Sequence, residues 1–416
     1  MELTRRQLMA GGVATATVMT GLSLAPPSVR AQQPDIIRIG VITDLSGIYR
    51  DVQGPTSVAC ARQAAEEFMA LNPDIKVEIL TADHQNKPDV GLSIVREWFD
   101  RSDVDLITDV GNSAVALGAR SIVEAKDKVS LVTSAGSSEL TGKSCSANTL
   151  HWGWDSWCLA HSTASSVVKT GGDKWFFVTA DYTFGHAAQA DATKFVEASG
   201  GKVVGSIRHP LSTSDFSSFL LSAQGSGANV IAFANSGGDL INAIKQAQEF
   251  GIAESGIKLA AMVGYINDVM GMGLPVAHGM MLTETFYWDL NDRTRAFYGR
   301  IKPKLPVNVF PNMSQAGNYS GVLHYLNAVK ALGVAQAKAS GRAVVERMKR
   351  MPTDDDCFGP GSIRADGRKI HPAYLFKVKA AKDGRGPGDV YEHVLTTPAE
   401  SAFRSLAEGS CPLIRT

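Results

Sequence analysis

The sequence predicts an α/β protein of two lobes, each built as a parallel, Rossmann-like sheet covered by helices. Three observations lead to this prediction. Short apolar segments alternate with helical ones from Ile36 onward, the alternation restarts after a Trp-rich segment at His151–Trp157, and loops rich in small and hydroxyl residues follow the apolar segments. Strands separated by helices at this spacing form parallel sheets with right-handed crossovers. Two successive sets of such units indicate two sheets and two lobes.

The first set of units alternates regularly between strands and helices. Apolar periodicity defines the segments, and a proline precedes or begins the first two helices. The predicted strands are 36–43, 76–81, 104–108 and 129–133, and the helices between them are 56–71, 88–101 and 114–126.

The second set repeats the pattern, and the third portion of the chain departs from it. In the second set we expect helices at 159–170, 187–199, 216–223 and 240–250, and strands at 174–179, 202–207, 230–234 and 257–262. The third portion predicts strands at 279–284 and 374–379, helices at 293–302, 315–332 and 342–350, a Gly-rich hairpin at 359–370 and a flexible loop at 382–389. We find no repeat of the solenoid type.

The N-terminal residues have the pattern of an export signal. Arg5 and Arg6 form a twin-arginine pair, a mild apolar run follows from Leu8 to Leu24, and a small-residue cleavage site ends at Ala31. We predict that residues 1–31 are a twin-arginine signal peptide and that the protein is periplasmic, with an amphipathic start of the mature chain as the alternative. Without a lipobox-type cysteine near this site, a lipid anchor is not expected.

Composition excludes several classes of partner. The chain has 416 residues, a length at which about two to three domains are expected. It contains 41 basic and 41 acidic side chains. Removing the signal would take away three basic residues and one acidic residue, and the chain stays near neutral. We therefore predict no nucleic-acid binding and no membrane insertion of the mature chain, because no basic field and no later apolar run of spanning length is present.

Catalytic and cofactor signatures are absent from the sequence. It contains no GxSxG nucleophile elbow and no HExxH motif, and its nine histidines lack metal-ligand spacing. The segment Gly271–Val276 begins like a dinucleotide loop but lacks the third glycine, and Gly384–Gly388 lies far from any strand–helix start. We predict no catalytic residues, no cofactor, no metal and no enzyme activity, with an exported enzyme of unmarked site as the alternative.

Loops at the predicted carboxyl ends of strands share one chemical style. Each mixes small residues, hydroxyls or amides, and aromatic rings, which together offer donors to a carboxylate and apolar faces to a side chain. The pairs and single residues are Ser46/Tyr49, Asn112/Ser113, Ala135/Ser137, Tyr182/Phe184, Asn235/Ser236 and Tyr265. Their joint occurrence in two sets of units favours a binding cleft over ordinary turns.

Several of these residues also fit structural roles. Taken alone, Tyr182 and Phe184 are more typical of packing than of ligand binding. The tryptophans Trp152, Trp154 and Trp157 are likewise more typical of a core between lobes than of a ligand wall. Asp44, at a strand exit, is typical of a turn or cap.

The loop from Ser134 to Thr141 is the strongest candidate within this set. It follows the predicted strand 129–133, and Ser138-Glu139-Leu140 could begin a short helix. Backbone N–H groups and hydroxyls in such a loop point beyond the strand end, where they can hold an anion. The alternative is an ordinary polar connection.

With these motifs the chain resembles the type I periplasmic solute-binding proteins of ABC transporters, in the branch that binds leucine, isoleucine, valine, amides and aromatic acids. The resemblance covers essentially the whole mature chain. It rests on Ile37–Val41 with Leu45-Ser46-Gly47, on Ser134–Thr141, on Asp181–Gly185, on Gln246–Gly251 and on the hairpin and strand from Gly367 to Val378.

The resemblance implies two lobes joined by three hinge crossings, with a ligand bound between them. We place the crossings near His151, Glu284 and His371. Lobe 1 is then 36–150 plus 285–370, and lobe 2 is 151–284 plus 371–416. The implied partners are a small-molecule ligand and the permease subunits of an ABC transporter, and we expect a monomer.

Positions carried over from the family name the ligand residues. Ala135, Gly136 and Ser137 would hold a ligand carboxylate, Ser113 would add a hydroxyl, and Phe184 would cover the ligand. The predicted ligand-binding residues are Tyr49, Ser113, Ser134, Ala135, Gly136, Ser137, Trp154, Tyr182, Phe184, Asn235, Ser236 and Tyr265.

One departure from the family bears on the ligand. Amino-acid binders place an acid near the position of Tyr265 to pair with the ligand ammonium, and here the nearest acid is Asp268. We therefore expect an aromatic or branched carboxylate, or an amide, rather than an ordinary α-amino acid. A ligand-binding sensory module is a further alternative function.

The chain has five cysteines, Cys60, Cys145, Cys158, Cys357 and Cys411, without a CxxC pair. An oxidising compartment allows one or two disulfides, and Cys60 lies in an Ala-rich helical segment typical of a buried small residue. The resemblance favours Cys145–Cys411, and the sequence-local alternative is Cys145–Cys158.

Overall fold

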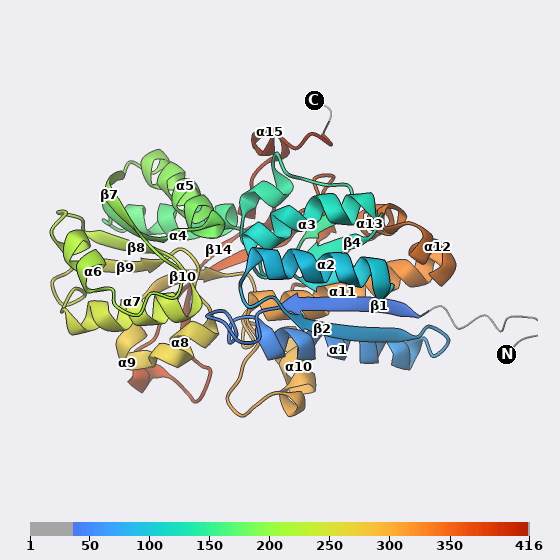
Figure 1. The fold of residues 1–416 in the computed structure, drawn as a ribbon. Helices are drawn as coiled ribbons and strands as arrows, with labels where there is room; N and C mark the ends of the chain where they lie inside the picture. The colour runs from blue at the N-terminus through green and yellow to red at the C-terminus, as the bar shows by residue number, and fades with distance from the viewer. Residues whose placement is uncertain (1–35, 415–416) are drawn as a thin grey trace, which may run out of the picture. The chain divides into compact units, whose positions relative to one another are not determined.

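The computed structural model describes residues 36–414 (Figure 1). The predicted signal peptide at 1–31 lies outside the described residues. The first sheet contains five parallel strands in the order β2-β1-β3-β4-β5. They are β1 (Ile37–Thr43), β2 (Val77–Asp83), β3 (Leu106–Asp109), β4 (Val129–Val132) and β5 (Thr149–His151).

Helices cover both faces of this sheet, which explains its continuous apolar strands. In β1, Ile39 and Val41 belong to the core shared with α1 (Gly54–Leu71) and α11 (Met313–Leu332), whereas Ile42 belongs to the core under α2 and α3. The other helices on this sheet are α2 (Pro88–Arg101), α3 (Ser113–Ala125), α12 (Val334–Ala339) and α13 (Gly341–Arg350).

The second sheet has seven strands in the order β14-β13-β10-β9-β8-β6-β7. Its parallel strands are β6 (Lys174–Ala180), β7 (Lys202–His209), β8 (Val230–Ala234), β9 (Lys258–Ala261) and β10 (Met281–Glu284), and the antiparallel ones are β13 (Ala373–Val378) and β14 (Tyr391–Thr397). Its helices are α4 (Ser156–Lys169), α5 (Thr183–Ala198), α6 (Ser217–Gln224) and α7 (Gly237–Glu249).

Most predicted elements are present, with shifts of a few residues at their ends. The structure adds β5, β14, α12 and two helices after β9, α8 (Ile266–Met272) and α9 (Leu274–Ala277). The remaining elements are α10 (Asp292–Ile301), the hairpin β11 (Ser362–Ile363) with β12 (Lys369–Ile370), short C-terminal helices α14 (Ala399–Ala402) and α15 (Leu406–Gly409), and 3-10 turns at Ser138–Thr141, Lys302–Lys304 and Ala381–Asp383. β14 escaped prediction because it is an edge strand, exposed at all but its two ends, and therefore lacks apolar alternation.

The chain contributes to the two sheets in alternation. It leaves the first sheet after β5, builds the second through β10, returns as α11 beside α1, and re-enters the second sheet as β13. The bounds given above for the two lobes stay a prediction.

A disulfide joins Cys145 to Cys411, the pair that the resemblance favours. It ties the C-terminal segment to the residues that follow the Ser138–Thr141 turn. Among the described residues the other three cysteines, Cys60, Cys158 and Cys357, are buried free thiols.

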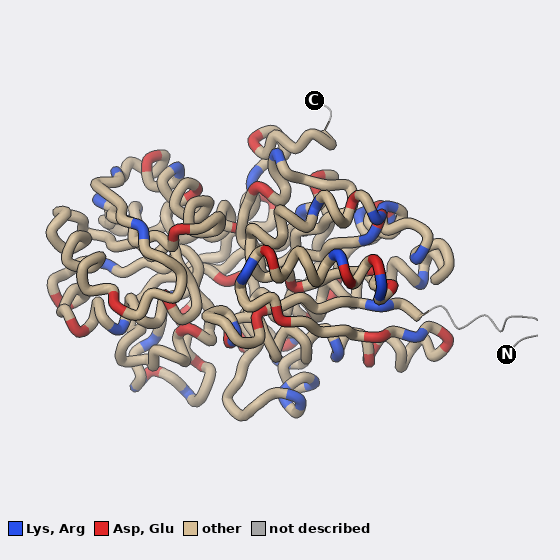
Figure 2. Tube along the Cα trace, in the orientation of Figure 1, with Lys and Arg blue, Asp and Glu red and all other residues tan. Residues whose placement is uncertain are grey.

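Charges of both signs are mixed along the chain rather than gathered in one region (Figure 2). Within residues 36–414, no helix combines the length and apolarity needed to cross a bilayer.

Candidate functional site

A small cavity lies where loops from the carboxyl ends of both sheets meet. The space within it that the centres of water molecules can reach is about 20 Å³, far below the volume of known ligand pockets, roughly 300 Å³ or more. All the lining residues follow strands. They are Tyr49, Val52, Gln53, Gly111, Ser113, Ser134, Gly136, Trp154, Tyr182, Phe184, Ser236, Val263 and Tyr265.

Most of the predicted ligand-binding residues meet at this cavity. Those that line it are Tyr49, Ser113, Ser134, Gly136, Trp154, Tyr182, Phe184, Ser236 and Tyr265. Ala135, Ser137 and Asn235 do not line it, although each is next in sequence to a residue that does. For all twelve predicted residues, including those that line the cavity, a role in ligand binding stays a prediction.

The turn after β1 is built around Asp44. Its carboxylate accepts N–H hydrogen bonds from Gly47 at 2.6 Å and from Tyr49 at 3.0 Å, and the side chain is fully buried. Asp44 therefore has the turn-forming role considered above, and this turn holds the backbone of Tyr49, which lines the cavity.

Ser113 and Ser134 come from the strand ends β3 and β4. Ser134 donates its hydroxyl to Asp109, which also accepts from Asn318 at 3.1 Å. Burial raises the pKa of the Asp109 carboxyl. Ser113 accepts the N–H of Ser137 at 3.3 Å and donates to no described residue, so its hydrogen can go to a ligand.

In the loop after β4 the carbonyl groups of two residues are engaged, whereas their N–H groups are not. The carbonyl of Ala135 accepts from His151 Nε2 at 2.8 Å, and the carbonyl of Gly136 accepts the N–H of Ser156 at 2.7 Å. Within residues 36–414 the N–H groups of Ala135 and Gly136 donate to no acceptor, and the buried Ser137 hydroxyl also lacks a partner. The short helix that was expected to begin at Ser138 is a 3-10 turn over Ser138–Thr141.

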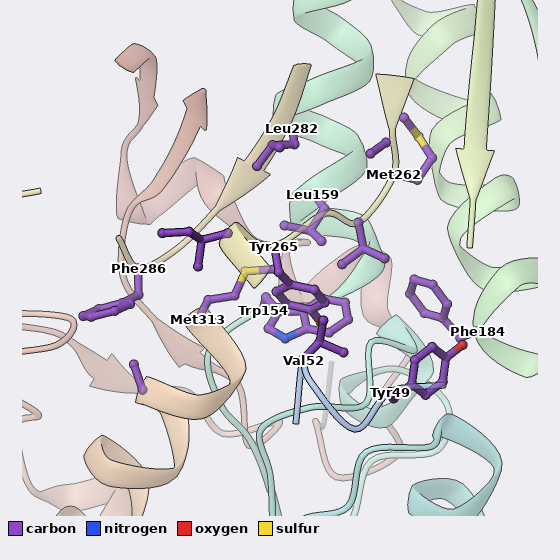
Figure 3. Close-up of a cluster of buried hydrophobic side chains, with 14 of the residues drawn as sticks. Tyr49, Val52, Trp154, Leu159, Phe184, Met262, Tyr265, Leu282, Phe286 and Met313 are labelled. Carbon is purple, nitrogen blue, oxygen red and sulfur yellow. The ribbon is translucent and has the colours of Figure 1, made fainter. Parts of the chain in front are cut away.

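Five of the lining residues are aromatic, and Figure 3 shows four of them, Tyr49, Trp154, Phe184 and Tyr265. The Trp154 ring meets Phe184 and Tyr265 edge to face, with 6.0 Å between centroids in both pairs. Tyr49 and Tyr182 approach from different sheets and their hydroxyls lie 2.6 Å apart. This hydrogen bond joins two lining residues that come from different sheets.

Gly136 is required by the approach of these rings to the loop. A Cβ at this position would lie 2.3 Å from Trp154 Cζ3 and 2.7 Å from Phe184 Cε2. The predicted binding loop therefore contains a glycine because two aromatic walls pack directly on its backbone.

A second buried acid, Glu284, lies near Tyr265 in addition to Asp268. Glu284, at the end of β10, accepts the N–H of Ile266 at 2.8 Å and the hydroxyl of Tyr391 at 2.9 Å. Asp268 accepts the N–H of Tyr265 at 3.1 Å. Burial raises the pKa of Asp268 to about 7 and that of Glu284 to about 8, and neither side chain lines the cavity.

Sequence reasoning missed Val52, Gln53, Gly111 and Val263 in the lining. Gln53 spans the gap between two loops by donating its amide to the carbonyl of Gly111 at 2.9 Å. The available signal was position alone, since all four follow strands β1, β3 or β9.

Among the tryptophans that were considered, Trp154 lines the cavity and the other two do not. Trp152 is fully buried, and Trp157 packs against His161 and Phe195. Thus the core role applies to two of the three rings.

None of the residues that line the cavity carries a charge. Among the described residues no cluster of His, Cys, Asp or Glu could hold a metal ion. The cavity can therefore recognise a ligand by hydroxyl and N–H donors, by shape and by aromatic contact.

Comparison with known proteins gives a consistent result. The family described as "Periplasmic binding protein" matches residues 36–385. A periplasmic binding protein from Burkholderia mallei is 42% identical, with a TM-score of 0.86, and the match covers 92% of this chain and 100% of that one.

Two further relatives extend this result. A branched chain amino acid ABC transporter periplasmic ligand-binding protein from Burkholderia xenovorans LB400 is 36% identical, with a TM-score of 0.79 and coverage of 91% of this chain and 99% of that one. Leu/Ile/Val-binding protein homolog 6 of Brucella melitensis is 25% identical over 375 residues, which is 88% of this chain and 93% of that protein.

Proposed function

This chain belongs to the periplasmic binding protein family, and on that premise we propose that it captures a small carboxylate-bearing ligand without an ammonium group. The family is extracytoplasmic, binds small molecules and serves ABC transporters. We further propose that this protein is exported by a twin-arginine signal, acts as a monomer without catalysis, and delivers its ligand to ABC permease subunits.

The observation that carries the proposed ligand class is the uncharged lining of the cavity. An ammonium group in this buried space would lack a carboxylate partner, and burying such a charge unpaired is costly. A carboxylate, in contrast, can be held by N–H and hydroxyl donors. The unengaged N–H group of Gly136 and the hydroxyl hydrogen of Ser113, both in the lining, supply such donors.

The rest of the wall supports an apolar body for the ligand. Five aromatic rings surround the space, and the buried Ser236 hydroxyl has no partner among the described residues. An aromatic or branched acid, or a related amide, matches this combination.

A thermal-shift screen followed by calorimetric titration tests the proposal. The compounds are benzoate, 4-hydroxybenzoate, 4-methylpentanoate, isobutyramide and L-leucine. We expect one of the first four to bind with 1:1 stoichiometry and to be recovered unchanged. At a hundredfold excess over Kd it should add about 2.7 kcal/mol to the apparent stability. Micromolar affinity for L-leucine without binding of any acid or amide would sink the proposal.

Matched serine variants connect this binding to the cavity. Ser113→Ala removes a lining hydroxyl and should weaken the binding of the acid by about tenfold. Ser162→Ala removes a buried hydroxyl without a partner on α4, outside the cavity, and should leave affinity unchanged. Equal effects of both substitutions would argue against the proposed site.

A further inference from the structure

Three side chains far apart in the sequence form a hydrogen-bonded chain that ends at the cavity. The indole N–H of Trp154 donates to Ser314 Oγ at 2.8 Å, and Ser314 Oγ–H donates to Tyr265 Oη at 3.3 Å. Trp154 and Tyr265 line the cavity, whereas Ser314 lies behind them at the start of α11 and is fully buried. Figure 3 shows the two rings together above Val52.

Chemistry fixes the direction of the first hydrogen bond in this chain, and geometry fixes that of the second. An indole nitrogen is a donor only, so Ser314 must accept from Trp154. The serine hydroxyl has a single hydrogen, and Tyr265 Oη receives it. The phenol cannot then use its own hydrogen toward Ser314, and this hydrogen has no acceptor among residues 36–414.

We propose that Ser314 is a specificity-determining residue, because it makes Tyr265 present a hydrogen-bond donor to the ligand. The ligand then carries an acceptor, such as a hydroxyl, ether or carbonyl oxygen, where it meets Tyr265. An ammonium group at that place would meet a hydrogen instead of a lone pair. This inference rests on the proposed function, since it specifies the far end of the same ligand.

A second hydrogen-bonded chain, which begins at Trp152, ends on an acceptor that has no hydrogen to donate. Trp152 donates its indole N–H to Ser320 Oγ at 2.8 Å, and Ser320 donates to the Asp355 carboxylate at 2.6 Å. Because a carboxylate accepts without donating, this chain ends there. The Trp154 chain ends instead on the phenol of Tyr265. This phenol accepts one hydrogen bond and still has its own hydrogen to donate.

Nuclear magnetic resonance of the tryptophan indole groups tests the chain without any ligand. In protein labelled with ¹⁵N-tryptophan, Trp154→Phe and Trp152→Phe assign the two indole resonances. Tyr265→Phe removes the acceptor of Ser314 and should shift the Trp154 resonance, although the hydroxyl of Tyr265 does not touch that N–H. Ser320→Ala is the matched control and should shift the Trp152 resonance alone. An unchanged Trp154 resonance in Tyr265→Phe would overturn the proposal.

Binding of isosteric pairs tests the consequence for specificity. The pairs are 4-methoxybenzoate against 4-(aminomethyl)benzoate, and 2-hydroxy-4-methylpentanoate against L-leucine. In each pair that binds, we expect the compound with the oxygen acceptor to bind at least about tenfold more tightly than the ammonium compound. Ser314→Ala should reduce that ratio, whereas Ser320→Ala should preserve it.

The two experiments separate this inference from the proposed function. A preference for the ammonium compounds, or a ratio unchanged by Ser314→Ala, would overturn the role of Ser314 even if carboxylates bind. If none of these four compounds and none of the acids and amides of the screen binds, the proposed ligand class fails. The indole resonances then still decide whether the hydrogen-bonded chain exists.

Discussion

The surroundings of Trp152 and Trp154 differ more than their positions suggest. The residues are two apart in sequence, 0% and 2% exposed, and each donates its indole N–H to a serine of α11 at 2.8 Å. Around Trp152 the serine leads to Asp355, and the ammonium of Lys369 lies 5.3 Å from the ring centroid. Around Trp154 the serine leads to Tyr265, and the neighbours are aromatic.

This difference teaches that the same local hydrogen bond serves two purposes. At Trp152 the hydrogen-bonded chain ends on a carboxylate inside the fold, which is typical of a core that stabilises the protein. At Trp154 one donor is left for a ligand. We therefore expect substitutions around Trp152 to change stability, and substitutions around Trp154 to change binding.

The largest effect on stability is expected from Asp355→Ala. The Asp355 carboxylate also accepts the N–H groups of Cys357 at 2.8 Å and Phe358 at 3.0 Å, and its charge favours the protonated form of Lys369. Its loss leaves donors and a buried charge unpaired, so the free energy of unfolding should fall by about 3–4 kcal/mol. Urea denaturation followed by circular dichroism measures this. Asp354→Ala, at an exposed neighbour, should cost well under half as much, and equal losses would contradict the charged core around Trp152.

Lys369→Met should act in the opposite direction. Burial lowers the pKa of Lys369 from 10.5 to about 8, so the folded protein releases a proton that the unfolded chain keeps between these pH values. Stability therefore rises with pH across that window, and below pH 8 the penalty is constant. Lys369→Met should raise the free energy of unfolding at pH 7 by about 3 kcal/mol, since one pKa unit is about 1.4 kcal/mol.

The pH profile provides the check on this substitution. The advantage of Lys369→Met over the wild type should shrink as the pH rises from 8 to 10.5. Lys377→Met, at an exposed position on β13, is the control and should follow the wild-type profile. If Lys369→Met raised the free energy of unfolding by the same amount at all pH values, packing and not charge would separate the surroundings of Trp152 from those of Trp154.

Two glycines allow the surroundings of Trp154 and Trp152 to be compared by adding a methyl group to each. Gly136→Ala would place a methyl group against Trp154 and should cost about 2 kcal/mol and abolish binding of the acid identified in the screen. Gly317→Ala on α11 would place its methyl 3.9 Å from Trp152 Cδ1 and 3.2 Å from Thr133 Cβ. Because alanine favours the helix by about 1 kcal/mol, we expect little net change there. Thermal unfolding and titration measure both, and retained binding in Gly136→Ala would contradict the cavity wall.

The smallest change in stability is expected from Tyr265→Phe. It removes only a phenol oxygen that accepts one long hydrogen bond, so the free energy of unfolding should change by less than about 1 kcal/mol. Ser320→Ala, which leaves the Trp152 indole unpaired, should cost about 1–3 kcal/mol. Chemical denaturation of the two variants compares them, and a greater loss in Tyr265→Phe would reverse the roles assigned to the two chains.

The sequence predicted where binding residues could come from but not which of them meet. The polar and aromatic residues after strands lie in loops that meet at the cavity, and nine of the twelve predicted residues line it. Ala135, Ser137 and Asn235 fell beside it, because one residue along a loop turns a side chain away from the space. The buried acid Glu284 beside Ile266 was missed, since it comes from another strand of the same sheet.

By itself the sequence determined the alternation of strands and helices, the parallel sheets and the loops that carry the site. These follow from apolar periodicity and from turn-forming residues, which act over a few positions. Only the tertiary structure decided that Ser314 stands between Trp154 and Tyr265, 160 and 49 residues away. The polarity of a hydrogen-bonded chain depends on which donors and acceptors packing brings within about 3 Å, and no local pattern encodes that.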